Sequence, residues 1–429
     1  MIRRLVQQRY QLGDLFAVVK GNARVLVITE GLSAVSFQWY STYLPLYMVA
    51  LGVSKVQVGL LASVLILTQF ISTLFGGYLA NRFGRKRVLV VFDIICWGIP
   101  MFLYAIARNP WYFLAGRFIN GFVHIVVPGF ECLFVEDVPV QHRAAVFGMM
   151  QFLIAAASLL APVAGFLVAW LGIVPAGRLI MAFNMITMVG IAIVRQCTMR
   201  ETSMGQERMS AVEGVPPLAL AREYLGAVRA MVGNRQVATF LVVRNLIAFT
   251  AIMWGTYSAI YLTDLRGIGL PKSSVAFFPF VSALATMGMI SLAARRIGSA
   301  QVFGNLVGGQ VLWLAAAACF VVSPAGTIWF AVLWTVIAAI STTLFQPANQ
   351  SYWANIVADR ERAQVFSASS ALTALCTLPA GPLAGVLYTF HPKAPFLLGM
   401  ALQVAALGFV LTLRLGQAKA PCEGQATYP

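Results

Sequence analysis

The sequence predicts an all-α membrane protein with twelve transmembrane helices in two pseudo-symmetric six-helix bundles. Of its 429 residues, 60% are hydrophobic and only 10% are charged, and the mean hydropathy is +0.81. A soluble globular domain carries about 25% charged residues. Since apolar segments follow one another from Val25 to Leu413 with only short interruptions, the chain leaves no room for a separate soluble catalytic domain.

Each predicted span is long enough to cross the bilayer, which requires about 20 apolar residues. The twelve spans cover residues 24–48, 56–80, 87–107, 111–135, 145–171, 176–195, 236–262, 273–294, 300–322, 327–352, 363–388 and 394–414. Six cysteines are scattered without metal-ligand spacing, so neither a metal nor a cofactor is expected. The net charge of +16 does not indicate nucleic-acid binding, because most of the 30 Lys and Arg residues lie in loops between apolar runs.

The basic residues are distributed unequally between the two sides of the membrane. One set of alternate loops holds six of them, whereas the other set, together with both termini, holds 22. By the positive-inside rule, both termini of this multi-pass protein are predicted to lie on the cytoplasmic side of the cell inner (plasma) membrane. The hydrophilic residues 196–235 form a cytoplasmic linker between an N-terminal bundle, 1–195, and a C-terminal bundle, 236–429. Apolar residues at helical spacing within 218–232 predict an amphipathic helix on the inner leaflet.

Short motifs recur between the two halves at a nearly constant offset, which apolar composition alone does not require. The matching pairs are YSTY at 40–43 with WGTY at 254–257, GVSKVQV at 52–58 with GLPKSSV at 269–275, and APVAG at 161–165 with GPLAG at 381–385. Two parallel six-span repeats imply a site between them, near the membrane midplane, for a small-molecule substrate.

Several motifs of this sequence resemble those of a known family. Residues 77–87, GYLANRFGRKR, resemble the loop between spans two and three of the major facilitator superfamily, G-x-L-a-D-R-x-G-r-k. Residues 117–121, RFING, resemble the family's fourth-span motif, and 161–165 resemble a weak form of its antiporter motif. The resemblance implies a monomeric transporter that rocks two bundles around a central cavity. Asn81 replaces the usual Asp, and alanines replace glycines of the antiporter motif, which weakens the case for antiport.

The loop between spans two and three also predicts a cytoplasmic gate. Gly84 permits a tight turn, and the basic side chains around it can pair with acidic groups at the inner end of span four. The alternative is that these basic residues only set the topology. The predicted gate consists of Gly77, Asn81, Arg82, Gly84, Arg85, Lys86, Glu136 and Asp137.

Away from the ends of the predicted spans, five charged residues lie where a charge is costly and indicates a functional site. Glu30, Asp93 and Glu131 lie at comparable depth, Glu30 and Asp93 each about 9 Å from the inner end of the span, while Arg117 lies nearer the outer face. The repeat aligns Glu30 with Arg244, so these two residues are candidates to face each other or one charged substrate. The alternatives are an ion pair that only stabilises packing and, for Asp93, a structural partner of the basic loop.

Polar and aromatic residues complete the predicted substrate and proton pathway. Tyr40, Tyr43, Trp254 and Tyr257 cluster in the outer halves of spans one and seven. They are predicted to form either an interfacial aromatic belt or stacking walls for an organic substrate. Asn120 belongs to the same pathway through the fourth-span motif.

The expected function is secondary active transport, because no nucleotide-binding loop of the G-x-x-x-x-G-K-[ST] kind occurs. Resemblance to multidrug proton antiporters, which combine an acidic residue in span one with the arginine corresponding to Arg117, implies proton-coupled export of a lipophilic or drug-like compound. Glu30 is then predicted to carry the coupling proton, with Glu131 as the second candidate.

Three other functions stay open at this point. Arg244 and the missing glycines favour a symporter or facilitator for nutrients such as sugars or organic anions. A lipid flippase would use the same aromatic surfaces. A membrane enzyme is least favoured, because no HExxH, histidine cluster or serine elbow is present.

Overall fold

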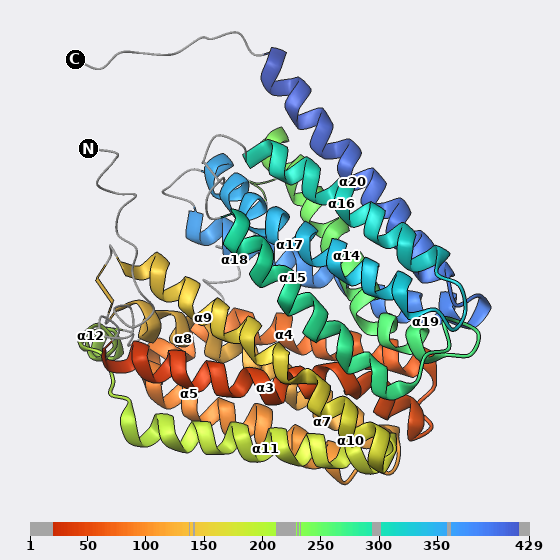
Figure 1. The fold of residues 1–429 in the computed structure, drawn as a ribbon. Coiled ribbons are helices and arrows are strands. Elements are labelled where there is room, and N and C mark those ends of the chain that lie inside the picture. The colour runs from red at the N-terminus through yellow and green to blue at the C-terminus, as the bar shows by residue number, and fades with distance from the viewer. Residues whose placement is uncertain are drawn as a thin grey trace. The chain divides into compact units, whose positions relative to one another are not determined.

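The computed structural model describes residues 20–136, 138–139, 142–211, 229, 231, 233–293, 302–357 and 362–419 (Figure 1). These residues form helices joined by short turns, and none of them lies in a strand. The predicted gate residue Asp137 lies outside the described residues. The same holds for the predicted amphipathic helix within 218–232, apart from residues 229 and 231.

The N-terminal half of the chain contributes six predicted spans, several of them built from more than one helical segment. In chain order they are α3 (Gly21–Ala50), α4 (Lys55–Phe83), α5 (Arg85–Asp93) with η1 (Ile94–Gly98) and α6 (Ile99–Ala105), α7 (Pro110–Gly121) with η2 (Phe122–Ile125) and α8 (Val126–Glu136), α9 (Arg143–Ala157) with η4 (Ser158–Leu160) and α10 (Ala161–Leu171), and α11 (Ile173–Thr198). A short helix, α12 (Ser203–Ala211), follows them.

The C-terminal half repeats this order. Its helices are α14 (Arg235–Thr263), η5 (Lys272–Ala276) with α15 (Phe277–Ala293), α16 (Val302–Val322), α17 (Ile328–Ile356), α18 (Arg362–Thr377) with α19 (Ala380–Phe390), and α20 (Ala394–Lys419).

The described residues contain 11 helical segments that are long and apolar enough to cross a membrane. α3 is also long enough, with 30 residues, but its polar side chains, among them Glu30, Ser33 and Gln38, lower its hydropathy. Large apolar side chains such as Phe166 and Trp170 are 70% and 74% exposed, as expected for helices surrounded by lipid. The chain is therefore an all-α membrane protein, and with α3 its helices match the twelve predicted spans.

Several spans are interrupted near a proline, which the prediction of continuous spans did not include. Proline has no N–H to donate, and its ring collides with the carbonyl group four residues earlier. The π-helical segment η1 precedes Pro100, and the 3₁₀ segment η4 precedes Pro162. The side chain of Asn120 donates from Nδ2 to the carbonyl oxygen of Cys96 within η1, at 2.8 Å. Asn120 therefore satisfies a backbone acceptor at the irregular turn.

Contacts within the chain divide it into two compact units. Unit 1 consists of Met1–Val53, Leu67–Val215 and Lys272–Ala283, and unit 2 consists of Ser54–Ile66, Pro216–Pro271 and Leu284–Pro429. Each unit thus contains one short segment from the opposite half of the sequence. The predicted bundles, residues 1–195 and 236–429, were defined from the sequence repeat, whereas the two units are defined by contacts. The division into these bundles stays a prediction.

In unit 1, three of the repeated motifs meet. The hydroxyl of Tyr43 donates to the carbonyl oxygen of Ser273 at 3.2 Å. Gly165 packs against the same backbone, where an added Cβ would lie only 2.6 Å from that oxygen. A side chain at position 165 would therefore displace the segment that Tyr43 holds.

The corresponding motifs meet in unit 2. The hydroxyl of Tyr257 donates to the carbonyl oxygen of Lys55 at 2.7 Å, and a Cβ added at Gly385 would lie 3.0 Å from the same oxygen. The same combination of a tyrosine hydroxyl, a backbone carbonyl and a glycine is thus present in both units. This contact explains why these motifs, rather than the apolar residues around them, match between the repeats.

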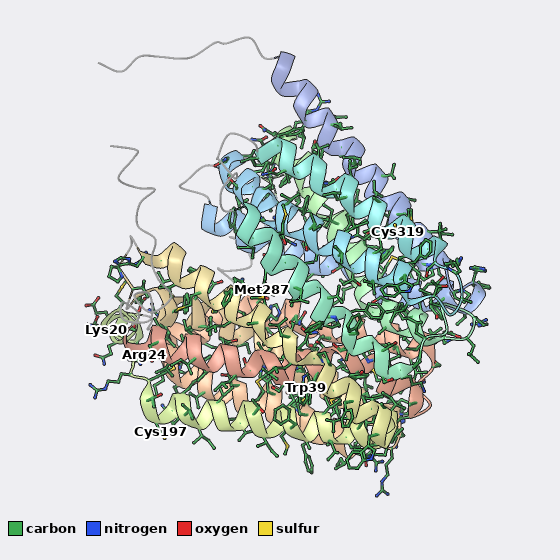
Figure 2. All side chains as sticks on the ribbon, viewed as in Figure 1. Lys20, Arg24, Trp39, Cys197, Met287 and Cys319 are labelled. Carbon is green, nitrogen blue, oxygen red and sulfur yellow. The ribbon has the colours of Figure 1, made fainter. Side chains whose placement is uncertain are left out.

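The cysteines that the structure describes are free. Cys197 on α11 and Cys319 on α16 lie in different units (Figure 2). They are available as single labelling positions rather than as parts of a metal or disulfide site.

Candidate functional site

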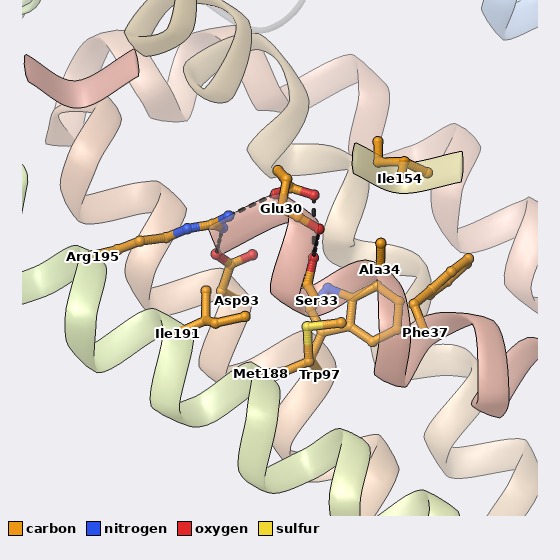
Figure 3. A pocket seen from close by; sticks show the side chains of 10 residues that line it. All are labelled: Glu30, Ser33, Ala34, Phe37, Asp93, Trp97, Ile154, Met188, Ile191 and Arg195. Atoms are coloured by element: carbon orange, nitrogen blue, oxygen red, sulfur yellow. Dashed lines mark hydrogen bonds and ion pairs between the residues drawn. The ribbon is translucent and has the colours of Figure 1, made fainter. Parts of the chain in front are cut away.

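A cavity of about 300 Å³ lies inside unit 1, between helices that are distant in the sequence (Figure 3). Its walls come from α3, α5, η1, α9 and α11. The lining residues are Glu30, Ser33, Ala34, Phe37, Asp93, Trp97, Ile154, Met188, Ile191 and Arg195. Most of these side chains are apolar, so the charged residues stand out.

Arg195 joins the two carboxylates of this cavity. Its Nη2 lies 2.6 Å from Oε1 of Glu30, and its Nη1 lies 2.8 Å from Oδ2 of Asp93. Its Nε and Nη2 also donate to Oγ1 of Thr29, at 3.1 and 3.0 Å. The Arg195 side chain is only 4% exposed, whereas the side chains of Glu30 and Asp93 are 28% and 10% exposed. Glu30 is therefore the accessible member of the cluster and Asp93 the enclosed one.

Arg195 is not among the predicted site residues, because it lies at the end of the predicted span 176–195, where a basic residue is expected from topology alone. The structure instead places Arg195 inside α11, three residues before the helix ends at Thr198, with its guanidinium between two other helices. The position of Arg195 in the membrane could have indicated its role. Glu30 and Asp93 lie at a similar distance from the inner membrane surface, and a long arginine side chain near the same surface can reach both. The predicted relation between Glu30 and Arg244 joins residues of different units and stays a prediction.

The cluster contains two carboxylates and one guanidinium. When all three groups are ionised, it has one negative charge in excess, and a buried charge without compensation is costly. A proton or a cationic group on Glu30 would remove this excess. Arg195 would then still hold Asp93, so no ion would be left without a partner.

Aromatic rings form one side of the cavity. The ring of Trp97 contacts Phe37 edge-on at 5.8 Å and Tyr40 edge-on at 6.1 Å, measured between ring centroids. Behind them, Tyr40 stacks on Tyr104 at 6.4 Å. Tyr40 is only 4% exposed, so it supports this wall from behind rather than lining the cavity.

The other predicted aromatic residues are buried within their units. Tyr43 and Tyr257 are fully buried and make the backbone contacts described above. Trp254 is 6% exposed and packs against several rings of unit 2, including Phe396 at 4.9 Å between centroids. None of these three residues lines the cavity around Glu30. Their place in a substrate pathway stays a prediction.

Two charged residues predicted for the pathway lie on α7 and α8. Arg117 is partly buried, and its Nε has no hydrogen-bond partner. Glu131 is exposed. Neither forms an ion pair with another residue that the structure describes. Glu131 therefore stays the second candidate for the coupling proton.

The predicted gate contains one buried ion pair. Arg85, which is 6% exposed, pairs through Nη1 with Oε1 of Glu136, and the same nitrogen lies 3.4 Å from Oγ1 of Thr202. Gly84 has a φ of +90°, which supplies the predicted tight turn. Glu201 accepts a hydrogen bond from the backbone N–H of Lys86 at 2.9 Å, a contact that the sequence analysis did not anticipate.

The remaining gate residues make weaker contacts. Arg82 is exposed and donates to the hydroxyl of Tyr78 at 2.5 Å. Asn81 is half-buried, and Gly77 has open space where a Cβ would be. Beside the Arg85 pair, a polar cavity of about 510 Å³ is lined by Glu136, Glu201 and their neighbours. The latching role of this region stays a prediction.

Arg244 lies on α14 in unit 2, with its guanidinium carbon 5.2 Å from the ring centroid of Trp353. Across the described part of the chain, no group of three or more His, Cys, Asp or Glu residues is arranged to hold a metal ion.

Comparisons with known proteins agree with this fold. Residues 26–305 match the family model described as Major Facilitator Superfamily. The chain is similar to the quinolone resistance protein NorA of Staphylococcus aureus, with 24% identity over 390 residues that cover 88% of this chain and 92% of that protein. It is also similar to the multidrug resistance protein MdtG of Citrobacter koseri, with 26% identity over 303 residues, 69% of this chain and 70% of that protein.

Solved structures share the fold at low sequence identity. The nucleoside transporter NupG gives a TM-score of 0.68 at 13% identity, covering 92% of this chain and 98% of that chain. A POT family transporter in complex with 5-aminolevulinic acid gives a TM-score of 0.69 at 12% identity, covering 92% and 96%. Because the family model matches well over half of the chain, this protein belongs to the major facilitator superfamily and is a multi-pass membrane transporter.

Proposed function

We propose that this transporter exports an organic, partly apolar compound in exchange for protons, with Glu30 as the proton-carrying group. The observation that carries the proposal is the Glu30–Arg195–Asp93 cluster in an apolar cavity of unit 1. The names of two relatives, a quinolone resistance protein and a multidrug resistance protein, support export of drug-like compounds.

The charge balance of the cluster supports proton coupling. With Glu30 ionised, Arg195 holds both carboxylates and the cavity has an excess negative charge. With Glu30 protonated, Arg195 and Asp93 form a neutral pair. Both states leave the guanidinium compensated, so the proton can bind and leave without exposing an unpaired ion to the membrane interior. Alternating access by rocking of the two repeats would present Glu30 to each side in turn.

The cavity walls support the substrate class. Trp97, Phe37 and Met188 offer aromatic and thioether surfaces, which bind flat or irregular apolar bodies without requiring one shape. Ser33 is the polar neighbour of Glu30, with its hydroxyl 3.4 Å from Oε2. A compound bound here would meet an apolar wall and one accessible carboxylate.

Two observations favour a second function, uptake of an organic anion by a symporter or facilitator. Arg244 offers a positive charge in unit 2, and Ala157 and Ala161 replace glycines of the family's antiporter motif.

The test is transport by purified protein in proteoliposomes with an imposed pH gradient. A panel of lipophilic cations, sugars and organic anions identifies the class that is concentrated against its gradient. We expect Glu30→Gln to abolish pH-driven accumulation while downhill exchange of the same compound continues.

Glu207→Gln is the matched control, since it removes an exposed carboxylate on α12, outside the cluster and outside the predicted proton pathway. A Glu30→Gln protein that still concentrates the compound would exclude Glu30 as the proton carrier and make Glu131 the next candidate.

A further inference from the structure

Arg244 is a partly buried cation without an acidic partner among the residues that the structure describes. Its Nε and Nη1 atoms are buried and have no hydrogen-bond partner. The ion pairs found among the described residues involve Lys55, Arg85 and Arg195, but not Arg244. In unit 2, Asp264 is the one acidic residue that the structure describes, and it already pairs with Lys55. No described carboxylate of this unit is therefore left for Arg244.

The guanidinium of Arg244 lies against an aromatic ring. Its guanidinium lies over the ring of Trp353, which is 1% exposed and belongs to the hydrophobic core of unit 2. Trp353 in turn stacks on Phe240 at 6.0 Å and on Phe366 at 5.8 Å between centroids. The cation thus lies against a rigid aromatic platform, which supplies no hydrogen-bond acceptor.

Contact with an aromatic ring gives the N–H groups of a guanidinium no hydrogen-bond acceptor. These groups present parallel donors whose spacing matches the two oxygens of a carboxylate or the oxygens of a phosphate. A buried donor that lacks an acceptor is costly, so an acceptor that arrives with a ligand would bind strongly. The missing group is an oxyanion.

We propose that Arg244 binds a carboxylate group of the transported compound. This inference rests on the proposed transport of an organic compound and specifies its chemical class. The compound then combines an apolar body with an anionic group. Anionic lipid headgroups offer the same oxyanion chemistry, so the experiment must separate these two sources.

The test compares two probes of nearly equal shape, 2-naphthoate and 2-naphthamide, in binding to the purified full-length protein. We expect wild-type protein to bind the carboxylate about tenfold or more tightly than the amide. Arg244→Gln should reduce this preference to about onefold, and Arg244→Lys should retain part of it, because lysine keeps the charge but not the paired donors. Arg235→Gln is the matched control on the same helix, since Arg235 is exposed at its start.

Equal binding of both probes by wild-type protein, or an unchanged preference in Arg244→Gln, would overturn the proposal. Vesicles of neutral lipid alone and of neutral lipid with phosphatidylglycerol separate the two sources. Competition by phosphatidylglycerol that disappears in Arg244→Gln would assign the site to a lipid headgroup instead of the transported compound. The preference should persist in Glu30→Gln, so a failure of proton coupling and a failure of this site give different results.

Discussion

Arg195 and Arg244 are both arginines inside membrane-spanning helices, but their surroundings differ. Arg195 in unit 1 is almost fully enclosed and donates to Glu30, Asp93 and Thr29. Arg244 in unit 2 lies over the ring of Trp353 and has two buried nitrogens without an acceptor in the described part of the chain. A cation whose charge is neutralised by protein carboxylates stabilises the folded protein. A cation without such carboxylates can instead bind an anionic ligand. The acceptors around each guanidinium, rather than its burial, therefore distinguish the two sites.

The largest expected effect comes from removing each cation in turn. Arg195→Met removes the cation shared by Glu30 and Asp93 and leaves the enclosed Asp93 carboxylate without compensation, so we expect a loss of about 3–5 kcal/mol in stability. Arg244→Met removes an uncompensated cation, so stability should stay the same or rise. Chemical denaturation of the purified variants in the same detergent measures both effects. Equal losses in the two variants would show that the environments of the two arginines do not differ as described.

A double-mutant cycle tests the comparison further, because it leaves Arg195, like Arg244, without a carboxylate partner among the described residues. Glu30→Gln and Asp93→Asn each leave Arg195 with one carboxylate, and each relieves the excess negative charge, so each should cost no more than about 2 kcal/mol. The double variant leaves the guanidinium without a carboxylate. Its loss should exceed the sum of the single losses by about 0.5–3 kcal/mol. Additive losses would mean that Arg195 does not depend on the two carboxylates jointly.

The helices were largely predictable because their signal is local. The predicted span at 236–262 corresponds to α14 (Arg235–Thr263), since a long apolar run has few alternatives to a transmembrane helix. The interruption before Pro100 was not predicted. Whether a proline produces a π-helical turn depends on a neighbouring acceptor or donor, here the side chain of Asn120, and that neighbour is set by tertiary packing.

The candidate site was predictable only in part. Glu30 and Asp93 stood out because an acidic residue in an apolar segment is costly. Arg195 did not stand out, because a basic residue at the end of a span is already explained by topology. Its pairing requires that α3, α5 and α11 lie side by side, which no single segment of the sequence specifies. Tyr43 and Tyr257 were noted for their repetition, but the reason for it, a hydroxyl contact with a distant backbone carbonyl, became visible only in the structure.

The smallest expected effect concerns Lys55 and Asp264, an intermediate case of one cation with one carboxylate. Burial raises the pKa of Asp264, but hydrogen bonds from Lys55, the backbone N–H of Arg266 and the hydroxyl of Tyr388 together lower it below the ordinary value of 3.8. A carboxyl whose pKa is lower in the folded state adds stability above its unfolded pKa, and this stability is lost as the pH falls through the folded value. Both side chains are partly exposed, 24% for Lys55 and 15% for Asp264, so the contribution should be no more than about 1 kcal/mol.

Thermal unfolding of wild-type protein and Asp264→Asn across a pH series checks this last expectation. Asp264→Asn should lower the unfolding temperature by a constant amount above about pH 5, and the difference should shrink as the pH falls below the ordinary pKa of aspartate. The Glu30–Arg195–Asp93 cluster is unchanged in both proteins, so its contribution cancels in the comparison. A difference that grows toward low pH would show that Asp264 gains no net stabilisation from Lys55. The partly exposed ion pair of Lys55 with Asp264 would then contribute no measurable stability, in contrast to the enclosed ion pairs of Arg195.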